Sequence, residues 1–98
     1  MENEDLQARR FVVTGRVQGV GYRYFVEHAA GQLGVKGYVR NRRDGSVEIL
    51  AMGTPGALAA LREALHDGPM MARVTNVSEE PEGIDSRYAA GFSIEMTL

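Results

Sequence analysis

The sequence predicts an α+β domain in which two helices cover one face of a mainly antiparallel sheet. Short β-branched segments, which favour strands, alternate with two stretches whose apolar residues recur at helical spacing. The predicted elements follow the order strand, helix, strand, strand, helix, strand, with one more short strand at the C-terminal end. This βαββαβ order is typical of ferredoxin-like sandwiches, and a chain of 98 residues suits one such domain.

The first half of the chain contains a strand, a helix and a second strand. The segment RFVVTGRV (10–17) is rich in β-branched residues, which predicts a strand. A helix is predicted over 22–33 and should end at Gly34, because glycine readily adopts the left-handed conformation that closes helices. The segment VKGYVRN (35–41) predicts the second strand. The apolar face of the helix consists of Tyr22, Phe25, Val26, Ala29 and Leu33.

The middle of the chain predicts a hairpin followed by a second helix. In RRDG (42–45), aspartate and glycine supply the positive backbone angles that tight hairpin turns need, and SVEILAM (46–52) is the third strand. Thr54 is a suitable N-cap and Pro55 a suitable first residue for a helix that ends at Gly68. The inner face of that helix carries Leu58, Leu61 and Leu65.

The two ends of the chain carry weaker signals. RVTNVSE (73–79) and FSIEM (92–96) predict two further short strands. We expect residues 1–8 to form a flexible polar tail and residues 9–98 to form the domain. Between the last two strands we interpret an acidic segment as a solvated loop, with Glu79, Glu80, Glu82 and Asp85.

Composition narrows the classes of function. The chain has no cysteine, which excludes disulfides, thiol catalysis and cysteine-bound metals. Its formal net charge of -2 gives no general attraction for nucleic acid or anionic membranes, and no apolar run is long enough for a membrane helix. Its two histidines have no partner at metal-ligand spacing. We therefore expect a cytoplasmic monomer without cofactor, metal, nucleic-acid partner or membrane anchor.

One segment, GRVQGVGYR (15–23), is rich in glycine and ends in arginine. Glycine permits tight folding with positive φ, so successive N–H groups of the loop can converge on one anion. The N-terminus of the following helix adds free N–H groups and a favourable dipole. Arg23, in the first helical turn, can donate two charge-assisted hydrogen bonds to a phosphate. The segment therefore predicts a cradle for phosphate or a similar oxyanion.

The residues alone leave another interpretation open. Glycines mark ordinary tight turns as often as phosphate sites, and neither the GxxxxGK[ST] nor the GxGxxG nucleotide motif is present. Arg23 could simply be a surface residue, and Asn41 could serve only as a turn former before the hairpin. The predicted topology brings the two regions together, because parallel strands 1 and 2 place the loop and Asn41 at the same edge of the sheet.

Two motifs taken together resemble the acylphosphatase family. GRVQGVGYR (15–23) is similar to the first signature of that family and GYVRNRRDGSVE (37–48) to the second, in the expected order and at the expected separation. The resemblance implies a ferredoxin-like fold and hydrolysis of acyl phosphates to a carboxylate and inorganic phosphate, without metal or cofactor. It also implies that Arg23 binds the substrate phosphate and that Asn41 orients the attacking water. The phosphate cradle would be completed by the backbone amides of Val17, Gln18, Gly19, Val20, Gly21 and Tyr22.

Two other classes of function are alternatives. RNA-recognition domains share the βαββαβ order, but they stack bases on aromatic residues of the central strands, where this chain has only Phe11, and its net charge is negative. A non-catalytic oxyanion-binding or regulatory module would keep the loop and Arg23 but would not need Asn41. The presence of Asn41 therefore favours the enzyme.

Overall fold

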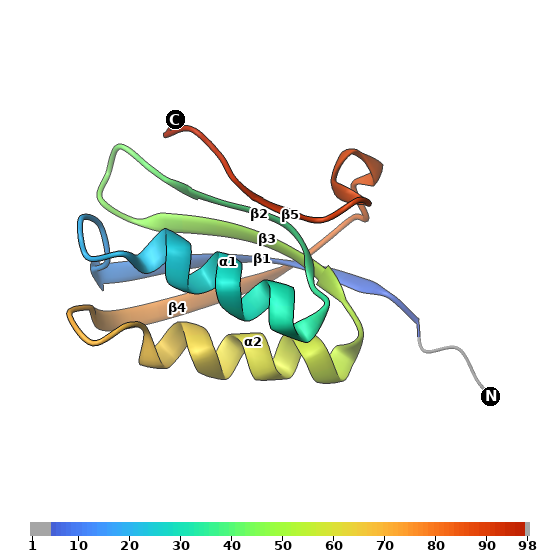
Figure 1. The fold of residues 1–98 in the computed structure, drawn as a ribbon, viewed down its shortest axis with the longest axis horizontal. Helices are drawn as coiled ribbons and strands as arrows, with labels where there is room; N and C mark the ends of the chain where they lie inside the picture. Colours follow the sequence, from blue (N-terminus) through green and yellow to red (C-terminus); the bar gives the residue numbers. More distant parts are fainter. Residues whose placement is uncertain (1–4, 98) are drawn as a thin grey trace.

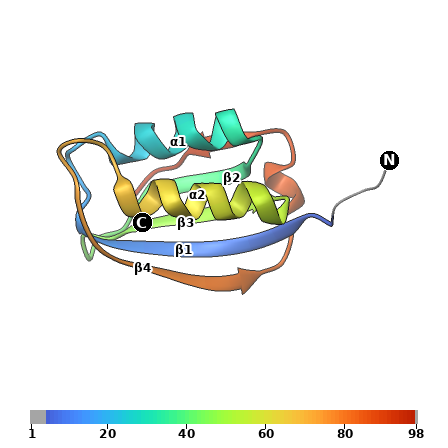
Figure 2. The same ribbon diagram turned by 90° about the horizontal axis from the view of Figure 1, so that it is seen from below.

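The computed structural model describes residues 5–97, in which five strands and two helices follow the predicted order. The chain runs through β1 (Gln7–Arg16), α1 (Tyr22–Leu33), β2 (Lys36–Asn41), β3 (Val47–Gly53), α2 (Pro55–Asp67), β4 (Arg73–Glu82), the 3₁₀ turn η1 (Ser86–Tyr88) and β5 (Phe92–Ile94). Both helices lie on one face of the sheet (Figure 1 and Figure 2). The predicted α+β, ferredoxin-like class is therefore confirmed.

The sheet has the strand order β4-β1-β3-β2-β5. Strand β3 pairs antiparallel with both β1 and β2, so β1 and β2 run parallel to each other with β3 between them. Strand β4 adds to β1 in antiparallel orientation, and β5 adds to β2 in parallel orientation. As a result, the β1–α1 loop and the β2–β3 hairpin lie at the same end of the molecule in both views (Figure 1 and Figure 2).

Local sequence signals fix the ends of both helices. Helix α1 begins after Gly21 and ends at Gly34, whose φ of 71° is left-handed as predicted. The N-cap of α2 is Thr54, whose hydroxyl accepts a hydrogen bond from the backbone N–H of Ala57 at 3.2 Å, and Pro55 opens the first turn. Each helix buries one stripe against the sheet, and the core includes Phe11, Val13, Val26, Val39, Ile49, Leu58, Leu61 and Leu65.

The N-terminal boundary of the domain differs from the prediction. Strand β1 already begins at Gln7, which pairs with Gly53 of β3, and Ala8 pairs with Met52. The tail predicted over residues 1–8 is therefore too long by at least these two residues, while residues 1–4 lie outside the described part. Tertiary pairing caused the difference, because Ala8 is buried by the neighbouring strand although the sequence around it is polar.

The last two strands also have different lengths from those predicted. Strand β4 extends to Glu82, so most of the acidic segment is paired strand rather than solvated loop. Its carboxylates bind arginines across the sheet: Glu79 lies 3.3 Å from Arg9, and Glu80 lies 2.9 Å from Arg10. Strand β5 is shorter than the predicted 92–96 and ends at Ile94. Neither helix in residues 5–97 is long and apolar enough to cross a membrane.

Candidate active site

The glycine-rich loop joins the end of β1 to the start of α1. Gly19 and Gly21 have φ angles of 75° and 80°, in the left-handed region where any larger residue is strained. Gly21 is the N-cap of α1, and no side chain in residues 5–97 caps this helix end. The N–H groups of the first turn of α1 therefore remain available to a ligand, together with the positive end of the helix dipole.

A cavity of about 220 Å³ opens beside the N-terminus of α1. The loop, the first helical turn and the end of β2 meet around it, as the predicted topology requires. Gln18 and Val20, which were also predicted to contribute backbone amides, are absent from its lining. The lining residues are Val17, Gly19, Gly21, Tyr22, Arg23, Tyr24 and Asn41.

Arg23 is the one positively charged residue in the described lining of this cavity. It lies in the first turn of α1, is partly exposed and forms no ion pair or side-chain hydrogen bond with another residue of the described chain. Its guanidinium is therefore free to bind an anion. By contrast, Arg40 and Arg42 of the neighbouring hairpin bind the carboxylate of Glu48 and do not line the cavity.

Asn41 is the last residue of β2. Side chains alternate along a strand, so Asn41 lies on the same helix-facing side as the buried Val39. Its Oδ1 atom is buried and accepts no hydrogen bond from residues 5–97. Buried polar atoms without partners are rare in native proteins, and each one calls for a functional or solvent partner. Here the neighbouring cavity is the place from which such a partner can come.

Gln18 has a contact that the sequence did not reveal. Its side-chain amide donates hydrogen bonds to the backbone oxygens of Arg42 at 2.8 Å and Ser46 at 2.9 Å. These two carbonyls belong to the β2–β3 hairpin, so Gln18 ties the glycine-rich loop to the strand end that carries Asn41. The side chain of Gln18 is thus structural, whereas the prediction concerned its backbone amide.

Two tyrosines complete the cavity. The hydroxyl of Tyr22 donates a 2.8 Å hydrogen bond to the backbone oxygen of Leu65 in α2, and burial raises the pKa of Tyr22 well above its usual value. This phenol therefore stays neutral and anchors the start of α1 to the second helix. Tyr24 was missed by the sequence reasoning, and its only signal was its position beside Arg23. It is 71 % exposed and lines the cavity.

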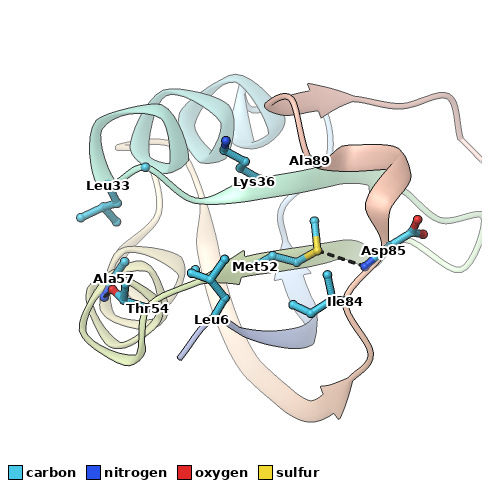
Figure 3. Close-up of a pocket in the computed structure, with 11 residues that line it drawn as sticks. Leu6, Leu33, Lys36, Met52, Thr54, Ala57, Ile84, Asp85 and Ala89 are labelled. Atoms are coloured by element: carbon cyan, nitrogen blue, oxygen red, sulfur yellow. Dashed lines mark hydrogen bonds between the residues drawn. The ribbon is translucent and has the colours of Figure 1, made fainter. Parts of the chain in front are cut away.

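A larger cavity of about 320 Å³ lies at the opposite end of α1 (Figure 3). Apolar side chains dominate its lining, with Leu6, Leu33, Met52, Ala57 and Ile84. No arginine of the described chain lines it, although Lys36 and Thr54, the N-cap of α2, do. The Thr54 hydroxyl already accepts a hydrogen bond from the backbone N–H of Ala57, so this helix N-terminus is capped, unlike that of α1. Among residues 5–97, no three histidine, aspartate or glutamate side chains are grouped closely enough to hold a metal ion.

The fold and the cavity together define a class of protein: a ferredoxin-like α+β domain with a cavity between a glycine-rich loop and a strand end. The sequence model of the acylphosphatase family matches residues 9–94. The chain is 51% identical over 94 residues to an acylphosphatase of Koribacter versatilis, covering 96% of this chain and 84% of the relative. It is 52% identical over 86 residues to an acylphosphatase of Pasteurella multocida, covering 88% and 94%.

A solved structure agrees with these sequence relatives. The crystal structure of acylphosphatase from Bacillus subtilis superposes with a TM-score of 0.86 at 42% identity, over 93% of this chain and 99% of that one. The chain therefore belongs to the acylphosphatase family. Family membership, the fold and relatives at this level of identity support an acylphosphatase enzyme, which is the activity that the two sequence motifs implied.

Proposed function

We propose that the chain hydrolyses small acyl phosphates in the cavity beside α1. Arg23 and the backbone N–H groups of residues 17–22 bind the substrate phosphate, and Asn41 orients the attacking water. One observation supports this assignment most directly: the buried Oδ1 of Asn41 has no partner in residues 5–97 and lies at the cavity that Arg23 also lines. A residue that acted only as a turn former would not need an unpaired buried acceptor there.

The phosphate end of the substrate is recognised by fixed donors. The N–H groups at the start of α1 and the guanidinium of Arg23 converge on the cavity from neighbouring positions of one helical turn. Charge develops on phosphate oxygens during phosphoryl transfer, so donors that are already in place stabilise the transition state without reorganising. Arginine adds a planar pair of donors that matches two phosphate oxygens.

The reaction needs no side-chain base. An acyl phosphate has a good carboxylate leaving group, and phosphoryl transfer usually passes through a loose transition state. Water held by the amide of Asn41 attacks phosphorus while the bond between phosphorus and the carboxylate oxygen breaks. The proton lost by the water passes to an oxygen of the phosphate itself. The products are a free carboxylate and inorganic phosphate, which balances the atoms without a titrating protein group.

Hydrolysis of benzoyl phosphate by the purified protein with a metal chelator present tests this function. We expect full turnover in the chelator, because charge stabilisation comes from arginine and backbone donors. If the protein shows no turnover but binds inorganic phosphate through Arg23, the loop serves a non-catalytic oxyanion-binding module instead. A rate that falls in the chelator and returns with a divalent cation would contradict the metal-free mechanism.

The rate of hydrolysis should also be nearly independent of pH between about 6 and 8. Histidine is the side chain that normally titrates in this range, and both His28 and His66 are exposed and lie outside the cavity lining. Tyr22 stays neutral because burial raises its pKa, and arginine stays charged. The measurement is kcat/KM against pH; a steep profile governed by a pKa near 7 would contradict the proton transfer to phosphate.

We further propose that the enzyme acts as a cytoplasmic monomer. The glycine-rich loop, the first turn of α1 and the end of β2 supply every residue of the proposed site. A chain without cysteine is suited to a reducing compartment, since it has no disulfide to lose. Specific activity in the benzoyl phosphate assay should then be the same at every enzyme concentration, and fractionation of the source cells tests the location.

A further inference from the structure

We propose that Glu48 is a positioning residue for hydrolysis, because it binds both arginines that flank Asn41 and so fixes the direction in which Asn41 points. Glu48 lies in the central strand β3, on the face of the sheet that the helices do not cover. The catalytic cavity lies on the other face. The inference rests on the role proposed for Asn41. The variants described below show whether a negative result contradicts the role of Glu48 or the role of Asn41.

The carboxylate of Glu48 is buried and held by four donor atoms. The residue is only 3 % exposed. The hydroxyl of Tyr38 donates to its Oε2 at 2.7 Å, and Arg40 reaches its Oε1 at 3.1 Å through both Nε and Nη2. Nε of Arg42 lies 3.5 Å from the same Oε1 atom. Glu48 is thus shared between one residue before Asn41 and one residue after it.

These partners keep Glu48 ionised. Burial by itself favours the protonated acid, yet the hydrogen bonds from Tyr38 and Arg40 and the charges of Arg40 and Arg42 outweigh it and lower the pKa of Glu48. Tyr38 is held in turn, because its ring packs against Tyr88 with centroids 5.1 Å apart and lies under the guanidinium of Arg40. The group is therefore a fixed anion in a rigid setting.

Strand geometry connects this group to the active site. Arg40 is directly opposite Glu48 in the pairing of β2 with β3, and Asn41 is directly opposite Val47. Successive side chains point to opposite faces of a strand, so Arg40 and Arg42 reach Glu48 on one face while Asn41 points toward the cavity on the other. Restraint on both neighbours sets the twist of the backbone at Asn41 and hence the direction of its Cα–Cβ bond.

A second restraint acts on the same strand end. The amide of Gln18 binds the backbone oxygen of Arg42 at 2.8 Å, from the side of the glycine-rich loop. Arg42 is therefore held through its side chain by Glu48 and through its backbone by Gln18. The two contacts together determine where Asn41 lies relative to the phosphate cradle.

Stability alone gives little reason for this arrangement. Desolvating a carboxylate is expensive, and apolar residues of similar size often serve at least as well in a buried position. Glu48 is the one carboxylate of residues 5–97 that is buried, whereas Glu79, which also binds two arginines, has a side chain that is 25% exposed. This buried carboxylate, Glu48, lies directly opposite Arg40, the residue that precedes Asn41 at the end of β2.

The test is Glu48→Gln, which keeps the shape and one acceptor but removes the charge. We expect kcat for benzoyl phosphate to fall about tenfold with KM nearly unchanged, because displacement of a catalytic group by a fraction of an ångström weakens the chemical step. In an Asn41→Ala background the same change should have no further effect on kcat, since the residue that it positions is already gone. Arg42→Gln changes a more exposed residue, so it should lower kcat by less than Glu48→Gln does. Its effect on kcat should likewise disappear in the Asn41→Ala background.

Glu79→Gln is the matched control. It removes a carboxylate that binds Arg62 through two short hydrogen bonds of 2.6 and 2.7 Å, on the edge strand β4 and away from the cavity lining. Its kcat should equal that of the wild type even where its melting temperature falls. Melting curves for all variants show whether each is folded at the assay temperature.

Several outcomes overturn the inference. If Glu48→Gln and Arg42→Gln keep full kcat while Asn41→Ala loses it, the positioning role is wrong and the proposed function stands. If Glu48→Gln lowers kcat equally with and without Asn41, or if Glu79→Gln has the same effect, the loss is a general loosening of the fold. If Asn41→Ala keeps full activity, the assigned role of Asn41 is itself wrong and the inference falls with it.

Discussion

Replacement of Arg23 by lysine or glutamine is expected to lower kcat/KM for benzoyl phosphate by at least about 10²–10³-fold. Arg23 lines the cavity and has no ion-pair partner in residues 5–97, so its donors are free for the phosphate. Lysine keeps the charge but offers a point charge in place of a planar pair of donors, so it should not restore the rate. Inorganic phosphate, as a product, should inhibit both variants more weakly than it inhibits the wild type.

Arg43→Gln is the control for this prediction. It makes the same change in net charge on an exposed residue of the β2–β3 hairpin that does not line the cavity. Exposed charges at a distance are screened by salt, so kcat/KM should stay within about twofold of the wild-type value. If Arg43→Gln were as damaging as Arg23→Gln, general attraction of the anionic substrate would explain the loss, and direct phosphate binding by Arg23 would be contradicted.

Asn41→Ala is expected to lower kcat by about 10² or more, with little change in KM. Alanine removes the partner of the water without removing a donor to the phosphate. The variant should nevertheless be at least as stable as the wild type, because Oδ1 of Asn41 is buried and unpaired in residues 5–97, and burial of an unpaired polar atom is unfavourable. Steady-state kinetics and thermal unfolding on the same preparation measure both effects.

This pair of measurements separates the two interpretations of Asn41 that the sequence left open. A turn former would lose stability when replaced by alanine, and its effect on turnover would follow the fraction of folded protein. A water-orienting residue loses turnover in a fully folded protein. An increase in KM alone, with kcat unchanged, would place Asn41 in substrate binding and contradict the assignment.

The sequence predicted the elements whose signals are local. Helix α1 ends at Gly34 and α2 begins at Thr54, as expected, because glycine at a C-cap and threonine at an N-cap act within one turn of the chain. The two edge strands were predicted less well. Strand β4 continues through Glu79 to Glu82, where its backbone pairs with β1 and its carboxylates bind arginines of that strand. Pairing between residues so distant in the chain leaves no local pattern.

For the candidate site, the sequence indicated which residue types could bind and cleave an acyl phosphate. Two motifs contain the glycines, Arg23 and Asn41. The order of the elements places both motifs at one end of the sheet. The contacts that hold them could not be predicted. Gln18 binds the hairpin 24 residues further along the chain. Glu48 is buried beside Tyr38 and Arg40, although strand alternation places these polar side chains on the face away from the core.

The amino-acid pattern was therefore enough to predict the order of strands and helices, the glycine-rich loop, and a cation and an amide suited to phosphate chemistry. These properties depend on conformational preferences and residue chemistry that act over a few residues. Three features became visible only in the folded chain: within residues 5–97 Asn41 keeps an unpaired buried acceptor, Tyr24 lines the cavity, and Arg40 and Arg42 bind one buried carboxylate. Burial and long-range hydrogen bonds arise when strands distant in the chain pair, and that pairing sets the environment of each side chain.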